Sequence, residues 1–195
     1  MLNQKHKFKN GQLRLRSWNY SWHGCYFITI KTKDRTSFFG EIAEGKMILN
    51  ESGKLAHELW EEIPKQFNFI HLGEFVVMPD HIHGILILQH PDSYYLNLAK
   101  DCSGVAIHRD QTENLSEIKK GGITGINNPM TQDTISKVIR WYKGRCSYDV
   151  RKTGIFLEWQ SRFYDHIIRN QQAFSRISQY IIDNPKNGKD NSGSR

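Results

Sequence analysis

The sequence predicts an α+β fold in which helices pack on an antiparallel sheet. Two kinds of segment lead to this prediction. Short apolar, β-branched runs with turn residues on both sides are typical of strands, and longer runs with apolar residues at helical spacing are typical of helices. Their order along the chain is strand, strand, helix, strand, strand, helix, helix, which favours an α+β arrangement.

The first half of the chain supplies four of these strands and one helix. Cys25–Lys31 is aromatic and β-branched and predicts a strand, and Lys46–Leu49 predicts a short second one. Apolar residues then recur at helical spacing between the start signal at Asn50 and Pro64, which predicts an amphipathic helix. Two further strands, joined tightly by a Pro-Asp pair, are His71–Met78 and His81–Gln89.

The second half begins with a polar stretch, residues 91–131, which we expect to be a flexible insertion or loop. Helical periodicity returns over residues 132–150. A final helix is predicted over about Gln171–Asn184, and it stops before Pro185. Residues 1–188 are expected to form a single domain, and residues 189–195 a disordered tail.

The composition is that of an ordinary globular protein. The 195 residues are 38% hydrophobic and 24% charged. No apolar run approaches the roughly 20 residues of a membrane-spanning helix, and the N-terminus has no secretory signal. We therefore expect a cytoplasmic protein without a membrane partner. The three cysteines, Cys25, Cys102 and Cys146, have no CxxC spacing, which argues against a disulfide framework or a cysteine-based zinc site.

The charge balance is basic. Twenty-seven Lys and Arg residues against 20 Asp and Glu give a net charge of +7. Such a balance favours polyanions, because each phosphate neutralised by a cation releases a condensed counterion. Many basic proteins bind no nucleic acid, so the charge leaves both interpretations open.

The sharpest local feature is the histidine pair His81 and His83. Side chains at positions i and i+2 of a strand leave the same face, so both imidazoles project together while Ile82 points the opposite way. Two adjacent imidazoles can bind a divalent metal, although two exposed histidines on a solvated strand are the alternative. Gly84, just beyond them, leaves room for another group to approach.

Tyr180 and Asn184 in the last helix are candidates to complete such a site, since they lie one turn apart. An amide oxygen can bind a hard metal, and a phenol beside it can attack a phosphodiester. An ordinary helix ending before a proline is the alternative. Spacing leaves the choice of tyrosine open, because three others lie in basic or polar surroundings: Tyr142, Tyr148 and Tyr164.

Four segments together resemble the REP-associated tyrosine transposases, a group of single-tyrosine HUH endonucleases. The resemblance spans residues 17–188 apart from 91–131. One segment, from Tyr26 to Thr29 and on to Phe39–Ile42, lies near the start of the chain. The others are EFVVMPDHIHGILIL (Glu74–Leu88), WQSRFYDHIIRN (Trp159–Asn170) and YIIDNP (Tyr180–Pro185).

The resemblance implies a ferredoxin-like HUH endonuclease domain with Tyr180 as its nucleophile. It implies that His81 and His83 bind the metal and that Asn184 helps to hold it. Two nitrogens and one oxygen suit Mn²⁺ or Zn²⁺ by ligand preference, whereas the resemblance implies Mg²⁺ or Mn²⁺, which we expect. Gly188 departs from the family, whose members commonly carry an aromatic residue there.

The implied reaction is transposase chemistry on single-stranded or hairpin DNA. The tyrosine becomes attached to the 5′ phosphate of the cut strand, and a free 3′ hydroxyl remains that can reverse the reaction. A catalytically inactive, domesticated protein that binds hairpin DNA or RNA is the alternative. A metal hydrolase that uses bound water is a third interpretation. A monomer and a homodimer both stay open.

Basic residues are the candidates for DNA contact. With a DNA-cutting site present, we expect the basic surface of the 132–150 helix to contact the DNA backbone, although a solvated helix face is the alternative. In the WQSRFYDHIIRN segment, Arg162 is a further candidate for DNA contact. Trp159, Phe163 and Tyr164 are candidates to stack on DNA or contact it, but core packing is the alternative for Trp159 and Phe163, and for the aromatic residues we favour packing in the core. The basic residues of the helix are Lys137, Arg140, Lys143 and Arg145.

Overall fold

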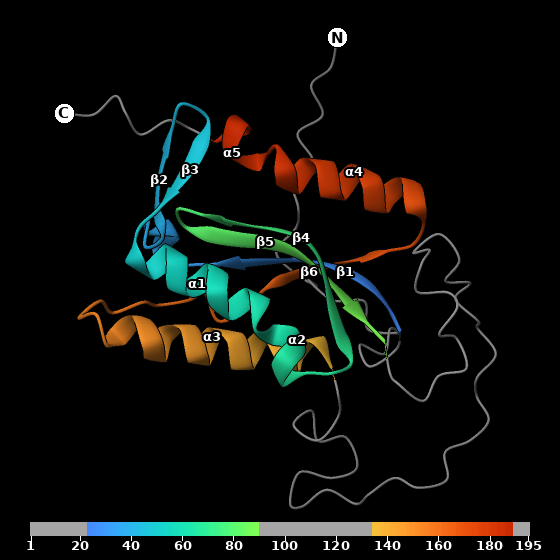
Figure 1. Ribbon diagram of the computed structural model, residues 1–195, viewed down its shortest axis with the longest axis horizontal. Coiled ribbons are helices and arrows are strands. Elements are labelled where there is room, and N and C mark those ends of the chain that lie inside the picture. The colour runs from blue at the N-terminus through green and yellow to red at the C-terminus, as the bar shows by residue number, and fades with distance from the viewer. Residues whose placement is uncertain (1–22, 90–133, 189–195) are drawn as a thin grey trace, which may run out of the picture.

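The structure of the protein is a computed structural model that describes residues 23–89 and 134–188 (Figure 1). The predicted insertion, 91–131, and the predicted tail, 189–195, lie outside the described residues. None of the helices in the described ranges is both long and apolar enough to cross a membrane.

A four-stranded antiparallel sheet forms the centre of the domain, with strand order β4-β5-β1-β6. Every neighbouring pair in it is antiparallel, as the sequence predicts. The connection between β4 and β5 is only two residues long, Pro79-Asp80. The four strands are β1 (Gly24–Lys31), β4 (Ile70–Met78), β5 (His81–Leu88) and β6 (Tyr164–Ile168).

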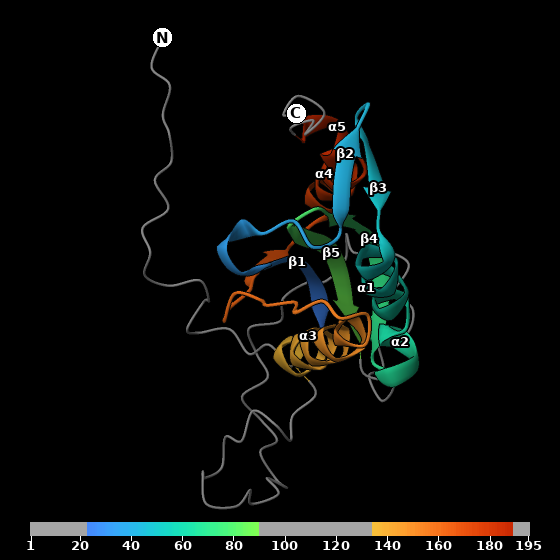
Figure 2. The same ribbon diagram turned by 90° about the vertical axis from the view of Figure 1, so that its left-hand side faces the viewer.

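A separate hairpin of β2 (Gly40–Ala43) and β3 (Lys46–Leu49) follows β1 after a short 3₁₀ turn, Lys33–Arg35. The hairpin extends past the end of the central sheet and lies against α5, as Figures 1 and 2 show. The sequence prediction includes β3 but misses β2. Only one large apolar residue, Ile42, falls within this four-residue strand, so the alternation signal is too short to detect.

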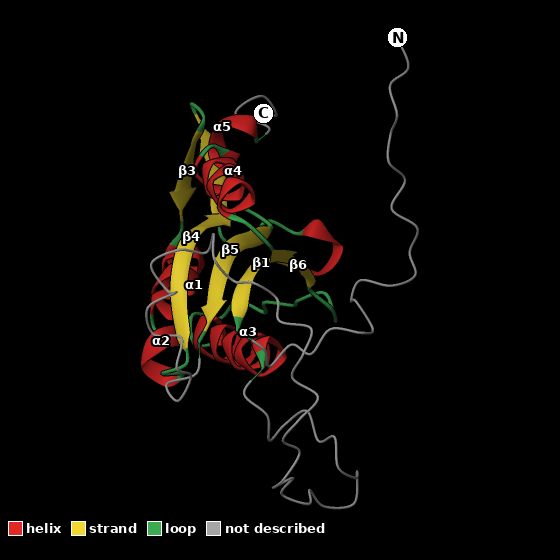
Figure 3. Cartoon of the chain, turned by 90° about the vertical axis from the view of Figure 1, so that its right-hand side faces the viewer, coloured by secondary structure: helices red, strands yellow, loops and turns green. Residues whose placement is uncertain are grey.

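Helices cover both faces of the sheet (Figures 1 and 3). On one face lie α1 (Glu51–Glu61), α2 (Ile63–Gln66) and α3 (Ile135–Arg151). On the other face lies α4 (Gln171–Ile182), followed by the short α5 (Asn184–Asn187). The three longer helices each begin with a side-chain cap that accepts a hydrogen bond from a backbone N–H three residues later. These caps are Asn50, Thr134 and Asn170.

The two faces bury two cores of different size. The larger core fills the space between the sheet and α1 and α3, and it includes Tyr26, Ile82 and Trp60. The smaller one lies between the sheet and α4 and includes Cys25, Ile85 and Ile181. Alternate residues of β5 therefore contribute to opposite cores. Two of the three cysteines, Cys25 and Cys146, are buried, and neither forms a disulfide within the part of the chain that the structure describes.

Gly84 allows the close approach that the sequence predicts, and the approaching group is Trp60. A Cβ atom at position 84 would lie 2.4 Å from Cζ2 of that indole. The glycine thus lets α1 pack closely on β5, directly behind the strand segment that carries the histidines.

Candidate functional site

The two histidines project from β5 toward the α4 face of the sheet, as predicted, while Ile82 is fully buried in the opposite core. The ring centroids of His81 and His83 lie 4.6 Å apart, with the planes inclined at 77°. His83 is 7% exposed, so this pair is not a solvated strand surface.

His83 is held from both sides of its ring. Thr29, its direct partner on β1, places Oγ1 2.9 Å from Nδ1 of the imidazole. On the other side, Nε2 lies 3.4 Å from the hydroxyl of Tyr180. Burial, followed by the nearby His81 and Lys31, lowers the pKa of His83 to about 3. The ring is therefore neutral at physiological pH and keeps a nitrogen lone pair.

His81 has a carboxylate partner of its own. Oδ1 of Asp80 lies 2.5 Å from Nδ1 of the ring, and the other carboxylate oxygen pairs with Nε of Arg35. Burial lowers the pKa of His81 even though Asp80 acts in the opposite direction. Burial also opposes the ionisation of Asp80, but hydrogen bonds from His81 and Arg35 outweigh it and lower the pKa of this carboxyl.

The turn that carries Asp80 is anchored to the segment that follows β1. The backbone carbonyl oxygen of Asp80 accepts hydrogen bonds from the backbone N–H of Thr32 at 3.0 Å and from the Thr32 hydroxyl at 2.9 Å. Arg35 reaches the turn from a left-handed backbone conformation, with φ of 60°. The start of β5, and with it His81, is therefore fixed from two sides.

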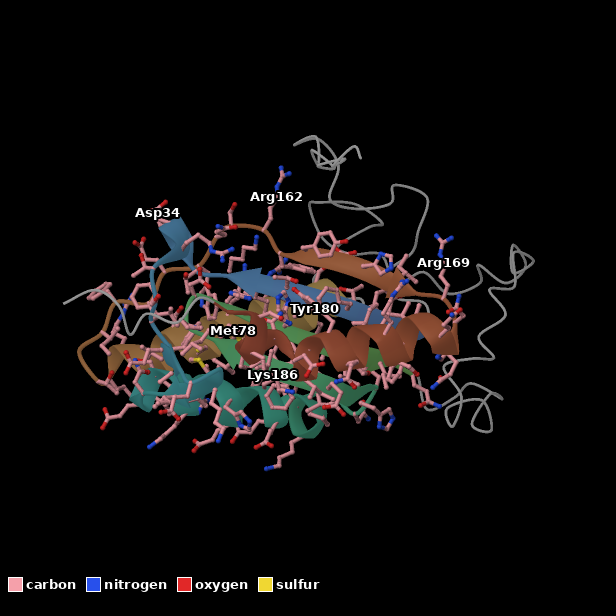
Figure 4. All side chains as sticks on the ribbon, turned by 90° about the horizontal axis from the view of Figure 1, so that it is seen from above. Asp34, Met78, Arg162, Arg169, Tyr180 and Lys186 are labelled. Atoms are coloured by element: carbon pink, nitrogen blue, oxygen red, sulfur yellow. The ribbon has the colours of Figure 1, made fainter. Side chains whose placement is uncertain are left out.

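Phe27 packs between the histidine site and two tyrosines. Its ring stacks on His83 at a centroid distance of 5.3 Å and meets the ring of Tyr180 edge-on at 6.1 Å. Tyr180 itself is 48% exposed. Figure 4, which views the α4 face, shows this side chain between α4 and the sheet. The phenol is thus positioned by aromatic contacts and is accessible from solvent.

Four tyrosines are candidate nucleophiles by spacing alone, and they differ in burial and in the residues that they contact. Tyr142 is fully buried, and its hydroxyl donates to the Ala56 carbonyl at 2.8 Å. Tyr148 is exposed on α3, which covers the opposite face of the sheet. Tyr164 lies on the α4 face, where its ring meets that of Phe27. Among the described tyrosines, Tyr180 contacts the histidine pair.

Asn184 does not belong to the helix that carries Tyr180. The final helix, predicted over about Gln171–Asn184, ends at Ile182 in the structure, and Asn184 begins α5, where it is buried. The chain after it is held at the His81 end of the sheet, because a Cβ at Gly188 would meet Ile42 at 2.1 Å and Met78 at 3.4 Å. A glycine at this position thus lets the chain pass closely over the β2–β3 hairpin.

The chemistry of the histidine pair fits a divalent cation. Each Nδ1 faces an oxygen partner, and in the tautomer with the proton on Nδ1 each Nε2 is left as a ligand. Among the described residues, no three His, Cys, Asp or Glu side chains gather to hold a metal. The third ligand predicted from the sequence, Asn184, is instead an amide.

The predicted basic surface of α3 is not brought to this site, because α3 and α4 lie on opposite faces of the sheet (Figure 1). Lys143 donates to the carbonyl oxygens of Gln160 at 2.7 Å and Arg162 at 3.1 Å. Burial lowers its pKa to about 8. The DNA contacts predicted for this helix stay predictions. The other members of the predicted set on α3 are Lys137, Arg140 and Arg145.

The WQSRFYDHIIRN segment divides between core and surface. Trp159 packs on the larger core, and its indole N–H donates to the Lys143 carbonyl at 3.1 Å, as the core interpretation predicts. Phe163 packs on the same core. Arg162 instead projects outward on the side of the molecule shown in Figure 4. The strand β6 within this segment is absent from the sequence prediction.

The sequence prediction also misses four residues that hold the histidines and the tyrosine. For one of them a signal exists, because Asp80 directly precedes His81 and its carboxylate is within reach of that ring. The other three residues reach the histidines or Asp80 only through strand pairing and a turn, and no local sequence pattern reveals such contacts. They are Phe27, Thr29 and Arg35.

Comparisons with known proteins support the fold. No model of a known protein family matches the sequence. An uncharacterized protein of Haemophilus influenzae is 33% identical over 174 residues, which cover 89% of this chain and 86% of that protein. The solved structure of a REP-associated tyrosine transposase bound to a REP hairpin superposes with a TM-score of 0.52 at 18% identity, covering 88% of this chain and 73% of that one. The predicted α+β fold, an antiparallel sheet with helices packed on it, is thereby confirmed.

A second solved structure, of a candidate transposase from Deinococcus radiodurans, has a TM-score of 0.44 at 14% identity. It covers 88% of this chain and 96% of that one.

Proposed function

This chain belongs to the same family as the Haemophilus influenzae protein, and we propose that it is a metal-dependent, single-tyrosine endonuclease that cuts and rejoins DNA. One observation carries the proposal: the hydroxyl of Tyr180 lies 3.4 Å from Nε2 of His83, whose ring centroid lies 4.6 Å from that of His81. A phenol and two metal-binding nitrogens therefore face one another at a place that solvent can reach. The HUH-type fold supports the same conclusion.

Tyr180 is the nucleophile in this proposal. Its phenol oxygen forms a bond to phosphorus and its proton is released to solvent. The bond from phosphorus to the 3′ oxygen breaks, and that oxygen takes up a proton to become a 3′ hydroxyl. The 5′ phosphate stays on the tyrosine as a diester, so a 3′ hydroxyl can attack it and restore the DNA strand. Phe27 contacts both the Tyr180 ring and the His83 ring, which supports this placement of the phenol.

His81, His83 and Asn184 are the residues that would hold Mg²⁺ or Mn²⁺. A divalent cation there supplies charge neutralisation at the phosphate and orients the leaving oxygen. Asp80 and Thr29 keep the two imidazoles in place. Burial lowers the pKa of both imidazoles, to about 3 for His83, and so favours the neutral form that can bind a cation.

The proposed substrate is single-stranded or hairpin DNA. The solved transposase of the same fold is bound to a REP hairpin, which suggests the type of nucleic acid. Lys31 lies close enough to influence both histidines and supplies positive charge that attracts a phosphate, whereas the charge of Arg35 is paired with Asp80.

The test is a covalent-adduct assay with end-labelled hairpin DNA that carries single-stranded flanks, in Mn²⁺ or Mg²⁺. We expect a labelled protein–DNA adduct with the wild type, none with Tyr180→Phe, and an undiminished yield with the control Tyr148→Phe on the opposite face. An adduct that persists in Tyr180→Phe would disprove the assignment of the nucleophile.

The same gel separates the alternatives. Cleavage without an adduct would replace the proposal with a metal hydrolase that uses water. Hairpin binding that survives a chelator, with neither cleavage nor adduct in any metal, would replace it with an inactive binding protein.

A further inference from the structure

Part of the sheet face beside the candidate site is left open by α4. This helix packs mainly on β4 and to a lesser extent on β5, whereas β6 is the edge strand on the other side of β1. Tyr164 pairs with Thr29, and His166 pairs with Phe27. Directly paired residues of an antiparallel sheet project to the same face, so Tyr164 and His166 share the face of the histidine site. Both are exposed.

An exposed aromatic ring lies on this open face. Tyr164 is 37% exposed, and its ring meets Phe27 edge-on at a centroid distance of 6.4 Å. Phe27 in turn contacts Tyr180 at 6.1 Å. The two phenols therefore flank one supporting ring, with Tyr180 on the helix side and Tyr164 on the side of the edge strand.

Three arginines surround the same strand. Arg162 precedes β6 and Arg169 follows it, and Figure 4 shows both side chains projecting outward along this edge. Arg176, on α4, lies near His166, because the pKa of His166 is lowered by burial and then by Arg169 and Arg176. Within residues 23–89 and 134–188, none of the three guanidinium groups forms an ion pair with a carboxylate.

The surface of α3 on the opposite face has a different character. It also presents an exposed tyrosine, Tyr148, with Lys152 4.5 Å above the ring. There, however, Arg145 and Lys152 both pair with Asp149, at 2.6 and 2.7 Å. Their charge is thus partly neutralised within the protein, whereas the arginines around β6 are available to phosphates.

We propose that this open face binds unpaired nucleotides of the DNA strand next to the cleaved bond, with one base stacked on Tyr164. We call it the β6 track, formed by Arg162, Tyr164, His166, Arg169 and Arg176. The inference rests on the proposed function for the position of the scissile phosphate, and it adds the route of the strand and the side of the protein that it follows. Aromatic rings with cations around them are the usual means of binding single strands.

Single-stranded DNA is the occupant that suits the track. The face of an unpaired base is free to stack on the Tyr164 ring, whereas the bases of a continuous duplex are stacked on one another. The guanidinium groups of Arg162, Arg169 and Arg176 complement phosphates along the backbone. A duplex can contact the same arginines, but it cannot offer a base to the tyrosine.

The experiment measures binding of a fluorescent oligothymidylate of about 12 nucleotides by anisotropy. It uses the full chain with Tyr180→Phe and EDTA, so that neither cleavage nor metal contributes. We expect the additional change Tyr164→Ala to weaken binding about 10-fold, and Tyr164→Phe to have little effect because the ring remains. The matched control is Tyr148→Ala, an exposed tyrosine beside a cation on the opposite face, which should leave binding unchanged.

The arginines give a second, independent measurement. Arg169→Ala and Arg176→Ala should each reduce the slope of log binding constant against log salt by about one. Binding of a blunt duplex of the same length should be insensitive to Tyr164→Ala. Equal affinity of Tyr164→Ala and its parent for the oligothymidylate would overturn the β6 track. A loss of binding in Tyr148→Ala that matches the loss in Tyr164→Ala would also overturn it.

Failure of this inference is distinguishable from failure of the proposed function. If the wild type forms the Tyr180 adduct but Tyr164→Ala leaves oligothymidylate binding unchanged, the β6 track alone is wrong. If binding depends on Tyr164 but no adduct forms in any metal, the track stands and the proposed reaction is wrong.

Discussion

Asp80 and His81, adjacent in sequence, also contact each other through their side chains, with 2.5 Å between Oδ1 and Nδ1. The second carboxylate oxygen pairs with Arg35. A carboxylate on Nδ1 fixes the proton there, keeps the ring oriented and makes Nε2 a better ligand. The Pro79-Asp80 turn therefore joins two strands and also orients the His81 ring for binding a cation.

Asp80→Asn should weaken Mn²⁺ binding by about 10- to 100-fold, as loss of an outer-shell carboxylate typically does. The reason is that an amide does not supply the negative charge that holds the Nδ1 proton. Isothermal titration calorimetry on the DNA-free protein measures this without relying on catalysis. Asp34→Asn is the matched control, since Asp34 is exposed in the neighbouring turn and its side chain points away from the site (Figure 4). Equal affinity of Asp80→Asn and wild type would contradict the role of Asp80.

Tyr142→Phe should lower the stability of the protein, whereas Tyr180→Phe should abolish adduct formation. The hydroxyl of Tyr142 is buried and donates to the Ala56 carbonyl, so its removal should lower the free energy of unfolding by about 1 kcal/mol while adduct formation continues. Tyr180 is half exposed, so Tyr180→Phe should change stability by about 0.5 kcal/mol or less and abolish the adduct. Urea unfolding and the adduct gel measure the two properties separately. A stable Tyr142→Phe protein without adduct would contradict this division.

The part of the site that could be predicted from sequence is the part that depends on local geometry. The alternation of β5 is sufficient to place His81 and His83 on one face and Ile82 on the other. Their partners could not be predicted in this way. Thr29 reaches His83 through the register of β1 against β5, which depends on residues 54 positions apart. The resemblance selects Tyr180 as the nucleophile, and its contact with His83 agrees with that choice. Tyr142 is excluded as a nucleophile because it is fully buried.

The missed strand β6 has a physical explanation. Its sequence, Tyr-Asp-His-Ile-Ile, places the polar Asp165 at an inward, buried position while the aromatic Tyr164 is exposed. The alternation of polar and apolar residues is therefore reversed at the start of the strand, and the strand does not match the usual pattern. Such a departure is expected where a strand serves binding as well as packing, which is the role proposed for the β6 track.

Gly84→Ala should destabilise the protein by about 1–3 kcal/mol, because the added methyl group would overlap the indole of Trp60. Cζ2 and Cε2 of that ring lie 2.4 and 2.9 Å from the position of the new atom, and the indole is fully buried and cannot move away freely. Urea unfolding measures the loss. A smaller ring at position 60 should relieve the overlap, so Trp60→Phe should cost less in the Gly84→Ala background than in the wild type. Additive effects of the two changes would show that this contact does not cause the destabilisation.

Lys143 should make the stability of the protein rise with pH. Burial lowers the pKa of this half-buried lysine to about 8, against 10.5 for an ordinary lysine. Between these two values the unfolded chain binds more protons than the folded one, so the free energy of unfolding increases through this window. The stability of the wild type relative to Lys143→Met should therefore rise between pH 8 and pH 10.5. The increase should stay below the roughly 1.4 kcal/mol per pH unit of a fully buried group, because solvent screens part of the effect. Urea unfolding across this range tests it, with the exposed helix position Lys54→Met as the control. A difference between wild type and Lys143→Met that stays constant with pH, or falls, would contradict the expected desolvation of Lys143.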